Sequence, residues 1–359
     1  MFIRDGIAPS PHMLDVVGTP PHRVLLTEAG PEAWLVTRYS DCKAVLADRR
    51  FLGTGAAPVP GAPDLRPLLF RSPGWPGGPS GPELRKLIAP RFTPARIADV
   101  PVRGIVSELL DDIASSGGPA DLCAAYTFPL PARVICALLG LRTDDLVSLA
   151  RWSADIVTPP FLIAPEVAEA SWEAIFSYFA RELGTSDEVR VGLAISLFVA
   201  GHETTTSQLG YGIVALLQAP DQADLVRASD EVATTAVEEI MRYFPINADG
   251  VPRLASEDVA VGGVVVPAGS TVIVGGPAAA FDPAHFPDPL RFDVTRDGAP
   301  HLSFGHGAHF CVGAALARTQ LRIALPELLR RFPDLRLEQD KLRIRQNLAG
   351  GLEELLVTW

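Results

Sequence analysis

A single helical segment, roughly residues 187–218, constrains the fold of this chain more than any other feature. Thr185 and Glu188 have the spacing of a capping box, with Ser186 as a rival cap, and Pro220 ends the segment. Roughly 32 residues, each adding about 1.5 Å, make a helix of about 48 Å, the full width of a domain of this size. Because the segment is apolar on most faces, we expect it to lie at the centre of the molecule with the other elements packed around it.

The rest of the chain contains helical patterns and short, strand-like runs. Helical patterns occur at about 40–48, 83–91, 94–116, 129–139, 143–157, 165–183, 230–243 and 312–331. A β-hairpin is expected at 24–38, and further strands within 258–275 and 342–358. The stretch from Gly53 to Pro82 is dense in Gly and Pro and predicts a long irregular loop. Since the β units are small and separate, this order indicates a mainly α protein of the α+β class.

Composition and charge exclude several classes of protein. The 359 residues carry a net charge of −11, which argues against a nucleic-acid binder and against a polybasic membrane-surface protein. The apolar runs near 191–201 and 264–276 are too short for a membrane span. The four cysteines form no CxxC pair and the N-terminus has no signal-peptide pattern, so we expect a cytoplasmic enzyme. The length allows two or three domains or one large enzyme domain.

The segment Phe304–Gly313, FGHGAHFCVG, is the most informative motif. Cys311 stands behind two glycines and before an expected helix, whose N-terminal charge and N–H groups favour a thiolate. Glycines let a backbone lie close to a flat group, so the loop suits an axial bond to haem iron. The alternatives are a buried structural cysteine and a zinc site with His306 and His309, although no second Cys/His cluster completes one.

The second motif, Ala200–Ser207 (AGHETTTS), lies in the middle of the long helix. Three consecutive threonines are poor helix formers, their hydroxyls can bond back to i−4 carbonyls, and Gly201 allows a local opening. A kinked helix carrying Glu203 beside Thr204 would place a proton-relay pair at a cavity. The alternative is a polar stripe that touches water or another helix. A third motif, Glu239-Ile-Met-Arg242, can form an ion pair but is uninformative alone.

The order of these motifs resembles one family. A long helix with AGHETTT, then ExxR, then FGxGxHxCxG is similar to the cytochrome P-450 superfamily, and most similar to its bacterial soluble class. The resemblance covers nearly the whole chain, including LRKLIAPRFTP, HFPDPLRFD and GLEELLVTW. It implies a cytochrome P-450 fold, with a long central helix and small β-sheets around a buried haem b, as one domain over residues 1–359.

The resemblance implies a role for each motif residue. Cys311 matches the axial thiolate to the haem iron, whose electron donation favours O–O cleavage. Glu203 and Thr204 match the acid–alcohol pair that delivers protons during oxygen activation. The other matches are the helix kink (Ala200, Gly201), the propionate-binding side chains (Arg253, Arg85, His309) and the loop beside the thiolate (Phe304, Gly305). Glu239 and Arg242 match a structural pair and are assigned no catalysis.

The chain departs from the family pattern at two places that bear on the site. The helix carrying Arg85 usually has a histidine four residues earlier, where this chain has Gly81, so one propionate contact is missing. The connection between the helix at 165–183 and the central helix is only Leu183–Asp187, which is very short for the family. We therefore expect the roof of the substrate pocket to be built differently.

The implied activity is a haem-thiolate monooxygenase that inserts one atom of dioxygen into a medium-sized organic substrate, by hydroxylation or epoxidation, in bacterial secondary metabolism. Two alternatives stay open. One is oxidative coupling, cyclisation or peroxide-driven oxidation at the same haem, including action on a carrier-tethered substrate. The other is a non-catalytic haem-binding or carrier-recruitment module, against which the intact Glu203–Thr204 pair argues. By family position, the pocket walls are 53–80, 155–172, 197–200 and 246–251 (with Asn247 and Asp249 as polar contacts), together with 347–351.

Local charge predicts the electron donor. Between Cys311 and Arg345 the chain has eight basic and four acidic residues, a balance of +4 within an acidic protein. Arg85, Lys86, Arg91 and Arg96 are expected on the same face. We expect this face to dock an acidic ferredoxin, itself reduced by a ferredoxin reductase; the alternative is ordinary solvated helix faces. We expect a monomer, with a small-molecule substrate and no nucleic-acid or membrane partner.

Overall fold

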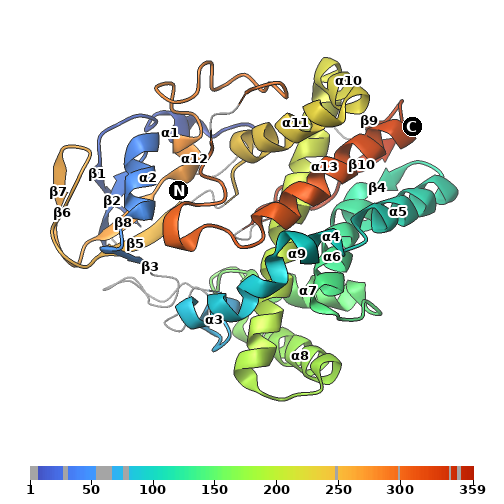
Figure 1. Ribbon diagram of the computed structural model, residues 1–359, viewed down its shortest axis with the longest axis horizontal. Coiled ribbons are helices and arrows are strands. Elements are labelled where there is room, and N and C mark those ends of the chain that lie inside the picture. The colour runs from blue at the N-terminus through green and yellow to red at the C-terminus, as the bar shows by residue number, and fades with distance from the viewer. Residues whose placement is uncertain are drawn as a thin grey trace.

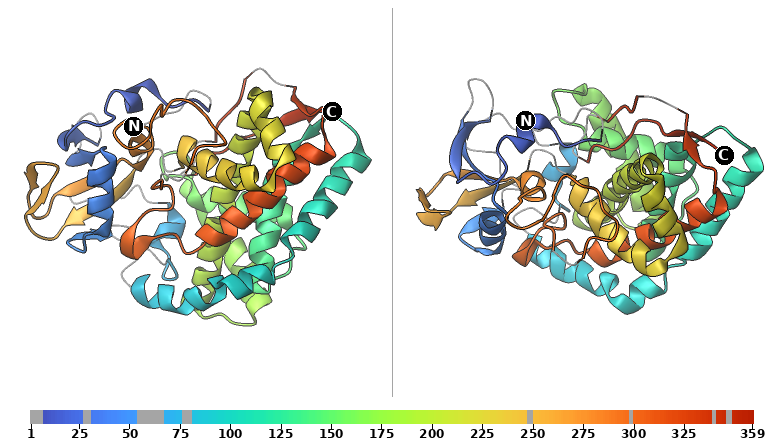
Figure 2. Two further views of the ribbon diagram at one scale, coloured as in Figure 1. Left: turned by 45° about the horizontal axis from the view of Figure 1, so that its top comes forward. Right: turned by 90° about the horizontal axis from the view of Figure 1, so that it is seen from above.

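The computed structural model describes residues 7–26, 31–53, 67–75, 81–246, 250–297, 300–338, 341–345 and 349–359. The largest sheet lies at one end of the molecule, and most of the helices form the rest (Figures 1 and 2). In the described ranges, no helix is both long enough and apolar enough to cross a membrane. The mainly α, α+β class predicted from the sequence is correct.

Helix α9 (Glu188–Gln218) runs through the helical part, as the sequence predicts (Figure 1). It is buried along most of its length. The predicted cap is wrong, because Asp187 and not Thr185 caps the helix: its carboxylate accepts a hydrogen bond from the Arg190 amide at 2.8 Å. An aspartate directly before a helix reaches the free N–H groups of the first turn and complements the helix dipole. The Thr185 hydroxyl instead accepts from the Asp187 amide.

The other long helices pack around α9 and form one continuous hydrophobic core. The helices that contact α9 are α6 (Pro129–Leu139), α8 (Pro165–Leu183), α10 (Pro220–Ala228), α11 (Asp230–Tyr243) and α13 (Ala314–Arg331). Helix α5 (Val102–Ser116) packs on α6 and α13, and α7 (Leu146–Val157) packs on α8. Shorter helical pieces are α1 (Pro11–Leu14), α2 (Tyr39–Ala47), α3 (Gly81–Ile88), α4 (Pro94–Ala98), α12 (Gly276–Ala279), η1 (Leu68–Arg71), η2 (Ala89–Phe92), η3 (Cys123–Thr127) and η4 (Gly307–His309).

The main sheet has the strand order β1-β2-β8-β5-β3. Strands β2 (Glu32–Val36) and β8 (Thr271–Val274) are parallel, whereas β1 (His22–Leu25), β5 (Val251–Ala255) and β3 (Phe51–Gly53) pair with their neighbours in antiparallel fashion. Two smaller sheets join β4 (Ala120–Asp121), β10 (Leu356–Thr358) and β9 (Arg336–Leu337), and join β6 (Val259–Val261) to β7 (Val264–Val266). The sheet matters for the site because β5 carries Arg253 to the helical part.

Some predicted boundaries differ from the observed ones. The helix expected at 94–116 is two helices, α4 and α5, because Pro101 has no amide hydrogen to continue the helical ladder. Within 342–358 the described residues hold only β10 and a single bridge between Ile344 and Leu352. Of the loop predicted at 53–82, the parts 54–66 and 76–80 lie outside the described residues.

The short connection before α9 is closed by a tight turn. Helix α8 ends at Gly184, whose φ of 62° is in the left-handed region that favours glycine, and α9 begins after Asp187. The segment 67–75 packs directly on the start of α9 and also contacts α7 and α8. A Cβ at Gly74 would collide with the backbone of Gly192, so the two glycines let the two backbones touch. This segment therefore covers the start of the central helix.

Candidate functional site

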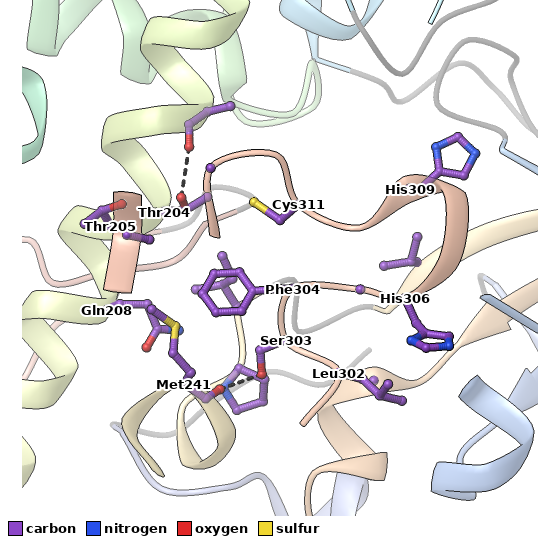
Figure 3. Close-up of a pocket in the computed structure, with 18 of the residues that line it drawn as sticks. Thr204, Thr205, Gln208, Met241, Leu302, Ser303, Phe304, His306, His309 and Cys311 are labelled. Carbon is purple, nitrogen blue, oxygen red and sulfur yellow. Dashed lines mark hydrogen bonds between the residues drawn. The ribbon is translucent and has the colours of Figure 1, made fainter. Parts of the chain in front are cut away.

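A cavity of about 420 Å³ lies between α9, β5 and the loop that precedes α13 (Figure 3). Three motifs far apart in the sequence meet there. The site residues predicted from sequence that line it are Ala200, Gly201, Thr204, Arg253, Phe304, Gly305, His309 and Cys311. Glu203 and Arg85 do not line it, and their positions are described below.

The Cys311 loop is shaped by a hydrogen bond and by glycines. The Cys311 amide donates to the Phe304 carbonyl oxygen at 2.8 Å and closes the loop. Gly305 and Gly307 have φ values of 72° and 69°. A Cβ at Gly307 would lie 2.7 Å from the Leu46 carbonyl oxygen, so glycine is what lets the loop pack on α2. The loop thus presents the cysteine to the cavity at the start of α13.

The Cys311 side chain reaches the cavity, whereas the thiols of Cys42, Cys123 and Cys136 are buried. Burial among protein atoms raises the pKa of the Cys311 thiol, while the Gly313 amide and the Arg85 charge act in the opposite direction. The expected N–H donors are therefore present but do not by themselves produce a thiolate. Coordination to a metal ion would deprotonate the thiol.

The two rival interpretations of Cys311 find no support in the structure. Its sulfur faces a cavity and not the packed core, which argues against a purely structural cysteine. Within the part of the chain that is described, no three His, Cys, Asp or Glu side chains lie close enough together to hold a metal ion. His306 and His309 therefore do not complete a zinc site with Cys311.

Phe304 is fixed beside the thiol by a charged cluster. The Arg318 guanidinium lies over the Phe304 ring, 4.4 Å from its centroid, and donates two hydrogen bonds to Glu238 at 2.6 and 2.8 Å. His301 lies 3.2 Å from the same carboxylate. Burial alone would raise the pKa of Glu238, but the hydrogen bonds from Arg318 and His301 outweigh it and lower the pKa to about 2.

The pair Glu239–Arg242 is buried below this loop. Arg242 donates two hydrogen bonds to the Glu239 carboxylate at 2.7 and 2.8 Å, and a third to the Ala280 carbonyl oxygen. Arg296 binds the same carboxylate at 3.1 Å. The pair therefore ties α11 to the segment 280–296, and a Ser303–Met241 hydrogen bond of 2.6 Å ties α11 to the Cys311 loop (Figure 3).

Arg253 and His309 line the other side of the cavity, and Arg85 lies behind the Cys311 loop. Arg253 is only 7 % exposed, and its one hydrogen bond goes to the Pro252 carbonyl oxygen; it has no acidic partner in the described ranges. Burial lowers its pKa, which shows that the charge lacks compensation. Burial and the charges of Arg253 and Arg85 lower the pKa of His309. Arg85 donates to the Phe310 carbonyl oxygen at 2.7 Å and so braces the Cys311 loop.

Helix α9 supplies the opposite wall. The Thr204 hydroxyl donates to the Ala200 carbonyl oxygen at 2.9 Å (Figure 3), and the Thr205 hydroxyl donates to Gly201 at 3.1 Å. These are the predicted i−4 bonds, but the segment remains α-helical through Gly201. Gly201 is required by packing instead, since a Cβ there would lie 2.8 Å from the Ile135 side chain of α6.

Glu203 points away from the cavity that its neighbour Thr204 lines. Its carboxylate is buried, 3.4 Å from His202 Nε2 and 3.8 Å from Arg345 Nη1. The predicted relay pair is therefore divided, with the alcohol at the cavity and the acid behind the wall.

Comparison with known proteins decides the family. The Cytochrome P450 family profile matches residues 227–352. A cytochrome P450 BJ-1 homolog of Sinorhizobium fredii is 36 % identical over the whole of this chain and 98 % of its own length. This chain belongs to the cytochrome P450 family.

Two further relatives agree with that assignment. The mycinamicin IV hydroxylase/epoxidase of Micromonospora griseorubida is 36 % identical over 92 % of this chain and 90 % of its own. The LnmA cytochrome P450 hydroxylase from the leinamycin pathway of Streptomyces atroolivaceus has a TM-score of 0.88, with 34 % identity over 99 % of this chain and 98 % of its own. The protein is a cytochrome P450 monooxygenase of the bacterial type, and its family takes haem.

The residues of this P450 fit that group. A thiol open to the cavity offers an axial ligand, and a buried guanidinium without an acidic partner suits a haem carboxylate. The alignment with the Sinorhizobium relative spans 393 positions and covers the 359 residues here, so about 34 of those positions are gaps in this chain.

The predicted pocket walls are only partly those of the observed cavity. Gly53, Trp75, Ala200, Ile246 and Val251 line it, whereas residues 155–172 do not. The reason is that the segment 67–75 lies against α7 and α8. Residues 349–351 do not line it either, and 247–249 and 346–348 lie outside the described residues, which leaves Asn247 and Asp249 untested.

Two buried glutamines at the cavity were missed. Gln208 Nε2 donates to the Phe244 carbonyl oxygen at 2.7 Å, while its Oε1 has no partner among the described residues. Gln320 of α13 also has an unpartnered Oε1. The position of Gln208, one helical turn after Thr204, is the signal that could have found the first (Figure 3). Gln320 has no comparable signal.

Proposed function

We propose that this P450 uses dioxygen and two electrons to hydroxylate or epoxidise a medium-sized, largely apolar molecule of bacterial secondary metabolism. The observation that carries the proposal is the joint position of the Cys311 thiol and the Thr204 hydroxyl at one cavity. Side chains such as Ile135, Ile246 and Val251 make much of the lining apolar. The hydroxylase/epoxidase among the relatives supports the same reaction class.

The proposed cofactor is haem b, held by the residues of one domain. In this proposal Cys311 is its axial ligand, Arg253 and His309 bind its carboxylates, and Phe304 and Gly305 pack beside the thiolate. Arg85 acts through the Phe310 carbonyl, by bracing the loop. When bound through a thiolate, haem supplies the redox chemistry that cleaves dioxygen.

The protein's own part of the mechanism is to control protons and water. The Thr204 hydroxyl rests on the Ala200 carbonyl oxygen and can rotate about one bond to donate into the cavity. Ala200 has only a methyl group and Gly201 has no side chain, so both leave space beside that hydroxyl. Glu203, one residue away, is the proposed source of the protons that Thr204 passes on. The apolar lining limits water to this polar wall and favours insertion over release of peroxide.

We propose that a ferredoxin supplies the electrons and docks on a basic patch of the surface. This patch contains fewer residues than the basic face predicted from the sequence. Arg318, Arg330 and Arg331 form ion pairs with Glu238, Asp230 and Asp111, and are therefore largely neutralised. Basic side chains without an ion pair in the described residues remain on α3, η2, α4 and α13: Lys86, Arg91, Arg96 and Arg322. We call these four the proximal patch. Such a patch steers an acidic partner to the side of the Cys311 helix.

The test of the proposed function is a spectrum. The reduced holoprotein with carbon monoxide should show the red-shifted Soret band of thiolate-ligated haem, and Cys311→Ser should lose it. Cys42→Ala is the matched control, because Cys42 is buried against Val36 at a distance from the cavity and should retain the band. Wild-type protein that binds haem but lacks the band would contradict the proposal.

A further inference from the structure

The buried imidazole of His202 lies directly behind the cavity wall on α9. Its Nδ1 is 2.8 Å from the Phe198 carbonyl oxygen. Its Nε2 is 3.1 Å from Ser153 Oγ of α7 and 3.4 Å from Glu203 Oε1. The rings of Phe198 and Phe128 pack on the imidazole, with centroids 4.4 and 5.4 Å away. These aromatic contacts prevent the ring from turning over inside the core.

The proton on Nδ1 follows from its partner. A carbonyl oxygen only accepts hydrogen bonds, so the contact with Phe198 requires a hydrogen on Nδ1. If the imidazole is neutral, Nε2 carries no hydrogen, and its lone pair faces the Glu203 carboxylate. Two lone pairs in contact inside a protein repel each other strongly, because no water separates them.

Ser153 would relieve this conflict only by withdrawing its hydrogen from the Leu149 carbonyl oxygen. Its hydroxyl has one hydrogen, and Oγ lies 2.7 Å from the Leu149 carbonyl oxygen, which again can only accept. With that hydrogen directed to Leu149, Ser153 Oγ also presents a lone pair to Nε2. Nε2 is then faced by two acceptors, so a hydrogen on Nε2 can be donated to Ser153 Oγ at 3.1 Å, and the resulting positive charge lies 3.4 Å from the Glu203 carboxylate.

We propose that His202 is an imidazolium whose Nε2 proton is held against Glu203, and that this pair is the proton reserve of the relay. Among the described residues, the charged groups around it include Glu203 on the same helix and Arg345, which lies 3.8 Å from Glu203. Helix α7 presents Ser153, and the residue before α6 is Phe128. The Arg345 charge favours the carboxylate form of Glu203 and so leaves the proton on His202. This inference rests on the proposed function.

The step conserves charge within the pair. The Nε2–H bond breaks and an O–H bond forms on Glu203 Oε1, so imidazolium and carboxylate become imidazole and carboxylic acid. The O–H bond on Glu203 then breaks, and its proton passes to the Thr204 hydroxyl oxygen as that hydroxyl donates its own proton into the cavity. This leaves imidazole and carboxylate, and a proton taken from solvent restores the imidazolium. Arg345, whose side chain is 26 % exposed, is the member of the cluster that meets solvent. His202 is therefore a positioning residue that acts through Glu203.

The first test is nitrogen NMR of histidine-labelled holoprotein in its reduced carbon monoxide form, with the His202 signal assigned by its loss in His202→Gln. We expect both ring nitrogens of His202 to be protonated at neutral pH. Glu203→Gln should remove the Nε2 proton, while Ser153→Ala should leave it in place. An unprotonated Nε2 in the wild type, or its alteration by Ser153→Ala alone, would overturn the proposal, since Ser153 would then be the donor.

The second test is the amount of product formed per pair of electrons. His202→Gln should lower this yield about tenfold, with the balance released as peroxide, and should leave the carbon monoxide spectrum unchanged. Thr206→Val is the matched control, because Thr206 is buried on the same helix and its hydroxyl has no partner. Wild-type yield in His202→Gln overturns the reserve. A wild type without product overturns the proposed function instead, whatever the NMR shows.

Discussion

The two sides of the cavity are held in opposite ways. Around Cys311, charged groups form short hydrogen bonds, as between Arg318 and Glu238 at 2.6 Å and between Arg242 and Glu239 at 2.7 Å. On α9, the Glu203 carboxylate lies 3.4 Å from His202 and 3.8 Å from Arg345, and the Thr204 hydroxyl donates to the Ala200 carbonyl oxygen of its own helix. The first side is suited to hold a ligand still, and the second is suited to let protons and hydroxyls rearrange.

The largest effect should come from removing the charge of Glu239 on the Cys311 side of the cavity, and it should be a loss of stability. Glu239→Gln leaves Arg242 and Arg296 facing a neutral amide in a site that is almost fully buried. We expect a loss of about 3–5 kcal/mol in the free energy of unfolding, because a buried charge then lacks its counter-charge. Urea unfolding followed by circular dichroism measures it. Glu231→Gln, at an exposed position on the same helix, is the control. Equal stability of the two variants would contradict the comparison.

On the α9 side, Thr204→Ala should lower the yield of product and leave the free energy of unfolding nearly unchanged. Without the hydroxyl, proton delivery loses its last donor, so the ratio of product to consumed electrons should fall about tenfold. Peroxide release and product, measured together, report this ratio. Thr204→Ser keeps a hydroxyl and should recover most of it. Tight coupling in Thr204→Ala would show that the hydroxyl at this wall takes no part in the relay.

The proximal patch should affect rate more than affinity. Arg322→Glu combined with Arg96→Glu should slow association with an acidic ferredoxin several-fold, about three- to tenfold at low salt, and weaken the dependence on ionic strength. Stopped-flow reduction measures the rate. Arg23→Glu reverses a charge on β1, at the other end of the molecule, and should leave the rate unchanged (Figure 1). If the association rate of the wild type with ferredoxin did not change with ionic strength, the proximal patch would have no role in docking.

The smallest effect should be on acid stability. The pKa of Glu238 is lowered from 4.5 to about 2, so its ion pair stabilises the fold fully above pH 4.5 and loses that effect as pH falls towards 2. Because the side chain is 40 % exposed, we expect only about 1 kcal/mol. Glu238→Gln should lower the free energy of unfolding at pH 6. The difference in this free energy between the variant and the wild type should become smaller as the pH falls towards 3. A constant difference between the two unfolding curves across this range would contradict the assignment.

The sequence predicts the Cys311 side of the cavity well and the α9 side incompletely. Cys311, its glycines and the Glu239–Arg242 pair have spacings that depend on local geometry, and such spacings are readable along a chain. The contacts of Glu203 depend on Arg345, more than a hundred residues away, and those of His202 depend on Ser153 on another helix. No local pattern encodes these meetings. The sequence counts Arg318 among the basic residues of the docking surface. In the structure Arg318 instead forms an ion pair with Glu238, which is 80 residues away along the chain and could not be foreseen from a local pattern.

The shared backbone contact of Gly74 and Gly192 has a consequence for how a substrate enters. Helix α8 is joined to α9 through a tight turn of a few residues, so it cannot swing far without moving the central helix. A substrate entrance that opened by displacement of α8 would therefore disturb the hydrophobic core around α9. We expect molecules to pass instead on the side of the cavity lined by Trp75, Ile246 and Val251. An added methyl group at residue 74 would collide with the backbone of Gly192 and so push the segment that carries Trp75 away from α9.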